Sequence, residues 1–127
     1  MDNMETVAQV CNIQPNGHYV QATVHNGTIY VSGQFSVDAD TGERKFGTVR
    51  EEAKQALDNI ELILKALGSD RSKILKTTAY VCSMDDWGEV NEAYAGFFKE
   101  HRPARTIVNA KELHFGFKVE IEAIAAL

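Results

Sequence analysis

The sequence predicts an α+β fold in which two helices pack on one face of a single mixed β-sheet. The elements are expected in the order β-hairpin, helix, strand, helix and two further strands. Each helical segment carries one apolar stripe at helical spacing, and such a helix buries only that side. Both helices are therefore expected to cover the same face of the sheet.

Two β-rich runs, residues 19–24 and 28–32, indicate the hairpin. Asn26-Gly27 lies between them, and this dipeptide favours the positive φ angles of a tight hairpin turn. The two runs are therefore expected to pair as antiparallel neighbours.

The first helix is expected over residues 48–67. Thr48 and Glu51 have the spacing of a capping box, which satisfies free N–H groups at a helix start. Gly68 is a suitable residue to end the helix. The apolar stripe consists of Val49, Ala53, Ala56, Leu57, Ile60, Ile63, Leu64 and Leu67.

The second half of the chain continues with a β-branched strand at 73–82. A second helix is expected to start near 83–86 and to end near His101, and strands at 105–110 and 118–125 follow. The expected buried face of this helix is Trp87, Val90, Ala93, Tyr94, Phe97 and Phe98.

The second face of the sheet also needs a cover. Apolar residues occupy both alternating faces in 79–81 and 119–125. One chain has no further element to bury that face, so a second copy is expected to do so. The sequence therefore predicts a homo-oligomer, with a closed ring as the expected form.

The length of 127 residues predicts one domain, 1–127, and no apolar run is long enough to span a bilayer. The net charge of −5 disfavours tight non-specific binding of nucleic acid, which depends on basic surfaces. Cys11 and Cys82 are far apart in sequence and are expected to be free thiols of a cytoplasmic protein. The four histidines lack the spacing of a metal motif, so no metal site is predicted.

Several common signatures are absent from the sequence. It contains no phosphate-binding loop ending in Gly-Lys-Ser/Thr, no dinucleotide-binding glycine pattern and no Gly-x-Ser-x-Gly turn. Kinases, Rossmann dehydrogenases and serine hydrolases of the common type are therefore not first choices.

Charges on two strands, expected to be neighbours, are the remaining candidate for chemistry. Arg105 opens one strand, and Glu120 and Glu122 share one face of the last strand. One interpretation is a structural Arg–Glu pair that fixes the two strands. The other is a pocket in which Arg105 holds a substrate carboxylate and a nearby glutamate positions or activates water.

These residues belong to a pattern that resembles the RidA/YjgF family of enamine/imine deaminases. The similarity runs through nearly the whole chain in order. It consists of Gly17 and Tyr19, Val31-Ser32-Gly33-Gln34, the turn at 38–42, Val90-Asn91-Glu92-Ala93-Tyr94 with Phe97-Phe98, Pro103-Ala104-Arg105, Val108, Lys111, Leu113, and Val119-Glu120-Ile121.

The resemblance implies a chorismate-mutase-like α+β fold assembled as a homotrimer. In it, the sheets form a central barrel and the pockets lie at the subunit interfaces. It also implies hydrolysis of 2-imino acids to 2-keto acids and ammonia, with no cofactor. Small 2-imino and 2-keto acids are then the expected ligands, with no membrane partner and no nucleic acid.

The same resemblance implies roles for single residues. Arg105 would bind the substrate carboxylate and Glu120 would position the attacking water. The expected substrate-binding residues are Tyr19, Ser32, Gly33, Asn91 and the backbone N–H of Ile107.

The chain also departs from the family pattern. His18, Ser36 and His114 stand where prolines are common, Ile107 stands where many relatives have Cys, and the loop before Pro103 is shorter. The short loop would alter one wall of the pocket and with it the accepted side chains. A non-enzymatic sensor of small carboxylates, a chaperone-like trimer and an endoribonuclease that inhibits translation remain as alternatives.

Overall fold

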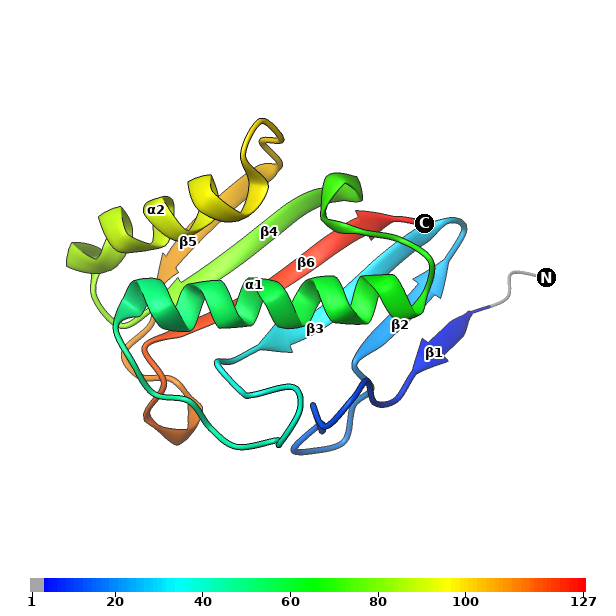
Figure 1. Cartoon of the computed structure of the whole chain (residues 1–127), viewed down its shortest axis with the longest axis horizontal. Helices are drawn as coiled ribbons and strands as arrows, with labels where there is room; N and C mark the ends of the chain where they lie inside the picture. The colour runs from blue at the N-terminus through cyan, green and yellow to red at the C-terminus, as the bar shows by residue number, and fades with distance from the viewer. Residues whose placement is uncertain (1–3) are drawn as a thin grey trace.

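In the computed structural model, which describes residues 4–127, six strands form one mixed sheet (Figure 1). The sheet has the order β1-β2-β3-β6-β4-β5, and every neighbouring pair is antiparallel except the parallel pair β4 and β5. The strands are β1 (Glu5–Val7), β2 (Ala22–His25), β3 (Thr28–Gln34), β4 (Ile74–Val81), β5 (Ala104–Asn109) and β6 (Val119–Ala126). The two helices are α1 (Val49–Ala66) and α2 (Trp87–Phe98).

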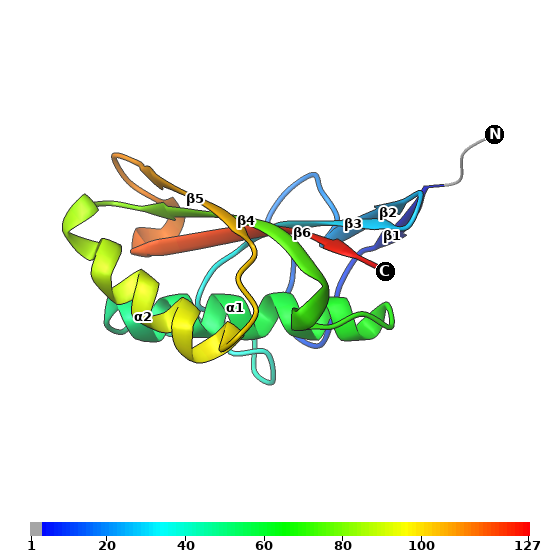
Figure 2. The same cartoon turned by 90° about the horizontal axis from the view of Figure 1, so that it is seen from above.

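Both helices lie on the same side of the sheet, as Figure 2 shows. This arrangement confirms the predicted packing of two helices on one mixed sheet. The capping box of α1 is also confirmed. Glu51 N–H donates to the Thr48 hydroxyl, and the Glu51 carboxylate accepts from Thr48 N–H. Three short 3-10 turns, Arg71–Lys73, Met84–Asp86 and His114–Gly116, connect the elements.

The core lies between the helices and alternate residues of the strands. Its strand residues include Ile29, Val31, Ile74, Ala79, Val81, Val119, Ile121, Ala123 and Ala125, and the apolar stripe of α1 packs against them. One expected core residue is not buried: Trp87 is 44% exposed. It is the first residue of α2, where the helix reaches the edge of the sheet, so the prediction that it is a core residue was wrong.

The predicted hairpin is confirmed, with shifted strand limits. Asn26 and Gly27 both have positive φ, at 51° and 78°. The first strand begins at Ala22 rather than Tyr19, so Tyr19 lies in the loop before it. The second extends to Gln34, which brings Gly33 into the sheet, where the register shifts between Val31 and Gln34.

Two features of the sheet differ from the expectation. Strand β1 is a short edge strand that was not predicted from the sequence. Strand β6 inserts between β3 and β4, so it pairs with β4 and not with β5. The prediction that Arg105 and Glu120 lie on neighbouring strands was therefore wrong.

The face of the sheet opposite the helices is open within residues 4–127. Tyr30 of β3 is 47% exposed there, and no helix of the described chain covers this face (Figure 2). None of the helices in this part of the chain is both long and apolar enough to cross a membrane. The single-domain prediction for 1–127 stays a prediction, since residues 1–3 lie outside the described residues.

Candidate active site

Arg105 lies near the start of β5, the edge strand beside α2. Its Nη1 atom donates a hydrogen bond to Oδ1 of Asn91 at 3.1 Å. Its guanidinium also lies over the rings of Tyr94 and Trp87, with Cζ 4.8 Å and 5.3 Å from their centroids. These three residues of α2 hold the planar guanidinium in place and leave its remaining N–H groups for a ligand.

Tyr94 is itself held in place by the sheet. Its hydroxyl lies 2.7 Å from Oγ1 of Thr77, which is the register partner of Arg105 in the parallel pair. Burial raises the pKa of Tyr94 to about 12, so this phenol stays neutral under Arg105. The helical spacing of Tyr94 and Trp87 predicted core positions for both, and their contact with Arg105 was not predicted. The signal was present, because positions 87, 91 and 94 fall on one helix face.

Ile107 follows two positions after Arg105 in the same strand and pairs with Ala79. Its side chain is partly buried and packs against the core. The side chain is thus committed to packing, and any ligand contact by this residue would come from its backbone.

Glu120 lies on the open face of the sheet, because its neighbours Val119 and Ile121 are fully buried on the helix side. Its carboxylate lies directly against Gly33 of β3. An ideal Cβ atom on Gly33 would be 2.2 Å from Oε2 and 2.9 Å from Cδ of Glu120. Glycine at position 33 therefore makes the room that this carboxylate occupies.

The environment of Glu120 favours its protonated form. Burial is the main cause that raises its pKa, and the charge of Glu122 on the same face raises it further. Glu122 is fixed in turn by Tyr80 of β4, whose hydroxyl donates to Oε1 at 3.2 Å. Tyr80 is also the direct register partner of Glu120. Three titratable groups therefore share this part of the open face.

Ser32 directly precedes Gly33 in β3, and Tyr19 lies in the loop before β2. The Ser32 hydroxyl donates to the carbonyl of Val20 at 2.7 Å, which ties the loop bearing Tyr19 to β3. Tyr19 is 48% exposed, and its hydroxyl accepts from the N–H of Asn16 at 3.0 Å. The ring is therefore positioned at the surface rather than packed in the core.

The expected site residues thus form two separate groups within one chain. Arg105, Asn91 and Ile107 lie at the β5 edge on the helix side. Tyr19, Ser32, Gly33 and Glu120 lie around β3 and β6, with Glu120 on the open face. Among residues 4–127, no ion pair joins Arg105 to either glutamate. The structural Arg–Glu pair considered above was therefore wrong, because β4 separates the two strands and the side chains point to opposite faces.

A cavity of about 320 Å³ between the helices holds none of these residues. A second one, of about 380 Å³, lies beside Arg105. The second is lined by Asn91, Tyr94, Ala95, Phe98, Lys99, His101, Arg102, Pro103 and Arg105. Its volume is in the range of small-molecule sites. Within 4–127 no group of three or more His, Cys, Asp or Glu side chains could hold a metal ion.

Comparison with known proteins adds to this geometry. The model of the family described as Endoribonuclease L-PSP matches residues 10–127. The 2-iminobutanoate/2-iminopropanoate deaminase of Rattus norvegicus is 46% identical over 109 residues, which cover 86% of this chain and 80% of the rat protein. The chain belongs to the RidA/YjgF family.

Solved RidA/YjgF structures share the whole fold. The YjgF gene product from E. coli is 38% identical, with a TM-score of 0.88 and coverage of 96% of this chain and 98% of that one. E. coli TdcF with bound serine is 31% identical, also with a TM-score of 0.88, and covers 97% and 99%. The shared fold covers nearly the whole chain, so both groups of candidate residues lie within it.

Proposed function

We propose that this chain hydrolyses 2-imino acids to 2-keto acids and ammonia. The observation that carries the proposal is the 46% identity to a 2-iminobutanoate/2-iminopropanoate deaminase over 86% of the chain. The bound serine of TdcF supports a ligand with an α-carboxylate and a nitrogen on the adjacent carbon. Water is the second reactant, so the reaction needs no cofactor.

Arg105 is proposed to bind the α-carboxylate. A guanidinium offers two parallel N–H donors to a carboxylate, and Asn91 and the two rings already fix its plane. The backbone N–H of Ile107 is proposed as a further donor to the same carboxylate. This orientation places the imine carbon at a defined point relative to the edge of β5.

Glu120 is proposed to position the attacking water. Water adds its oxygen to the imine carbon while one of its protons passes to the imine nitrogen, which gives a carbinolamine. The C–N bond then breaks, the hydroxyl proton moves to nitrogen, and ammonia leaves as the ketone forms. Burial raises the pKa of the Glu120 carboxyl, which makes its carboxylate a stronger base for accepting and returning these protons.

A second copy of the chain is proposed to complete each pocket. Arg105 and Glu120 point to opposite faces of their own sheet, so one chain cannot bring them to the same substrate. A homotrimer in which the open faces form a central barrel would bring the Tyr19, Ser32, Gly33 and Glu120 group of one subunit to Arg105 of the next. The uncovered sheet face supports such an assembly. So does Glu120, which is half-buried on that face in the single chain.

The test is suppression of imine capture. An amino-acid oxidase generates 2-imino acids, and semicarbazide traps whatever imine survives. Wild-type protein should lower the trapped fraction, and Arg105→Ala should not, while its mass in solution stays that of the wild-type oligomer. Arg50→Ala, which removes an exposed arginine of α1 outside the candidate site, should behave as wild type.

The proposal fails if Arg105→Ala suppresses capture as well as wild type does. If neither protein suppresses capture but 2-keto acids raise the melting temperature of wild type, the chain is a sensor of small carboxylates.

RNA cleavage is the second candidate, because the matching family model carries that description. The net charge of −5 works against RNA affinity. Nuclease activity that remains with a repurified oligomer and disappears in Arg105→Ala would favour it. The cytoplasmic location and the action of the chain as one domain are further parts of our proposal.

A further inference from the structure

The cavity beside Arg105 has an unusual charge composition. Its lining contains the cations Arg105, Arg102 and Lys99 and no aspartate or glutamate, in a chain whose net charge is −5. Glu100 stands between two lining residues in the sequence but does not line the cavity. A concave surface with charges of one sign attracts counter-ions strongly, so this cavity favours an anionic ligand.

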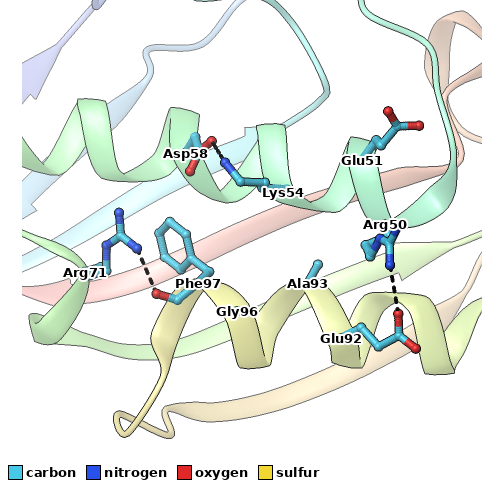
Figure 3. Close-up of a pocket in the computed structure, with 9 residues that line it drawn as sticks. All are labelled: Arg50, Glu51, Lys54, Asp58, Arg71, Glu92, Ala93, Gly96 and Phe97. Atoms are coloured by element: carbon cyan, nitrogen blue, oxygen red, sulfur yellow. Dashed lines mark hydrogen bonds and ion pairs between the residues drawn. The ribbon is translucent and has the colours of Figure 1, made fainter.

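The cations of the other cavity, between α1 and α2, provide a contrast (Figure 3). There, Arg50 pairs with Glu92 at 3.4 Å, and Lys54 pairs with Asp58 at 2.7 Å. Arg71, in the turn that precedes β4, pairs with Glu61 of α1. Each cation of that groove is thus neutralised by the protein itself.

Neither Arg102 nor Lys99 has such a partner. Within residues 4–127, their side chains take part in no hydrogen bond and no ion pair. Arg105 has a neutral amide and two aromatic rings as its partners, so its charge is also uncompensated. Three uncompensated cations in one cavity exceed what a single carboxylate needs.

The chain brings these groups within reach of one small molecule. Arg102 and Arg105 are three residues apart, so their Cα atoms are at most ~11 Å from each other, and both side chains are long.

Lys99 ends α2 with φ 57° and ψ −112°, the mirror image of the extended region. Glycine is the residue that adopts this conformation without strain, yet a lysine stands here.

We infer that Arg102 and Lys99 form a second anion subsite, so that the preferred substrates are 2-imino acids with a second carboxylate. The inference rests on the proposed function, in which Arg105 binds the α-carboxylate. A 2-imino acid formed from a common amino acid carries a second negative charge only when it derives from aspartate or glutamate. The substrate class is therefore the four- and five-carbon 2-imino dicarboxylates.

The experiment compares kcat/KM for imines from aspartate and glutamate with that for imines from alanine and 2-aminobutyrate. Wild type should favour the dicarboxylates. Arg102→Ala and Lys99→Gly should each lower kcat/KM for the dicarboxylates about tenfold and leave kcat/KM for the monocarboxylates unchanged. Lys99→Gly also relieves the backbone strain, so loss of folding cannot explain its effect. Arg50→Ala makes the same change in net charge as Arg102→Ala and should alter neither substrate class.

Equal activity on both classes in wild type would overturn the inference, and so would an equal loss on both classes in Arg102→Ala. If wild type hydrolyses no imine, the proposed function fails. Ligand binding then tests on its own whether Arg102 and Lys99 form an anion subsite. The binding probes are then 2-ketoglutarate and 2-ketobutyrate, measured by calorimetry. Tighter binding of the dicarboxylate that Arg102→Ala abolishes would uphold the subsite, and equal binding of the two acids would overturn it.

Discussion

Gly33 and Glu120 fit together so closely that a Cβ atom at position 33 would lie 2.2 Å from Oε2 of the carboxylate. The two residues belong to neighbouring antiparallel strands, β3 and β6. The atoms that such a Cβ would meet are all in the Glu120 side chain. The contact thus limits where the Glu120 carboxylate can lie. Neither residue belongs to the hydrophobic core.

Gly33→Ala is therefore expected to move the Glu120 carboxylate and to reduce imine hydrolysis by at least about tenfold. The side chain of Glu120 can rotate away, so the free energy of unfolding should fall by less than about 1 kcal/mol. Imine-capture kinetics and urea denaturation measure the two effects. Gly88→Ala, at a glycine of α2 with open space around its Cβ position, is the matched control and should keep full activity.

The pH dependence of activity should respond to Glu122. Burial and the charge of Glu122 both raise the pKa of Glu120, so Glu122→Gln removes the second cause and lowers that pKa. If ionised Glu120 positions water, the rise of kcat/KM with pH should shift to lower pH in this variant. Tyr80→Phe, which removes the hydrogen bond to Glu122 but no charge, tests whether the position of Glu122 matters. An unchanged pH profile in Glu122→Gln would contradict the coupling of the two carboxylates.

Glu120 also has a predictable effect on stability. Its pKa is raised in the folded state, so the folded chain binds more protons than the unfolded chain over the interval between the two pKa values. The contribution of this group to stability is therefore present at low pH and is lost as pH rises through its folded pKa. Glu120→Gln should remove this loss. Its free energy of unfolding, measured by denaturation, should exceed that of wild type at pH 8 and equal it at pH 4.

The Arg71–Glu61 pair should make the stability of the fold decrease at low pH, which is the opposite of the effect of Glu120. Arg71 makes two side-chain hydrogen bonds to this carboxylate, at 2.8 and 2.5 Å, and stacks on Phe97 with Cζ 4.0 Å from the ring centroid. The hydrogen bonds from Arg71 hold the pKa of Glu61 below its ordinary value of 4.5. Stability from this pair is present above pH 4.5 and is lost as pH falls through the lowered pKa.

Arg71→Ala should consequently lower the free energy of unfolding at pH 7 by about 2 kcal/mol. This is less than for a fully buried pair, because the Arg71 side chain is 40% exposed and solvent screens it. The difference from wild type should shrink when both proteins are denatured at pH 3. A constant difference between pH 7 and pH 3 would show that packing on Phe97, not the ion pair, carries the effect.

Local features of this fold could be predicted because each is encoded within a few residues. The capping box of Thr48 and Glu51 and the positive φ angles at Asn26-Gly27 depend on neighbours in the chain. The alternation around Glu120 likewise follows from the two-residue period of a strand.

Strand order could not be predicted in the same way. The insertion of β6 between β3 and β4 joins residues far apart in the sequence, and no local pattern indicates it. The same insertion separates Arg105 from Glu120 and divides the candidate site into two groups. Edge strand β1 was missed because three residues are too few to show a period. Trp87 was misplaced because helical spacing gives the face of a residue but not its position at the end of the sheet.

Asn91 offers a direct test of how Arg105 is held. Its Oδ1 atom accepts from Nη1 of Arg105 at 3.1 Å, on an exposed part of α2. Asn91→Ala leaves the guanidinium on the two rings but free to turn, so kcat/KM should fall about tenfold with little change in stability. Asn91→Asp keeps the shape of the side chain and supplies a carboxylate that competes with the substrate for Arg105. The loss should therefore be greater with Asp than with Ala, and KM should rise. Steady-state kinetics on both variants measure the two losses. If Asn91→Asp is as active as Asn91→Ala or more active, Arg105 does not bind the substrate carboxylate.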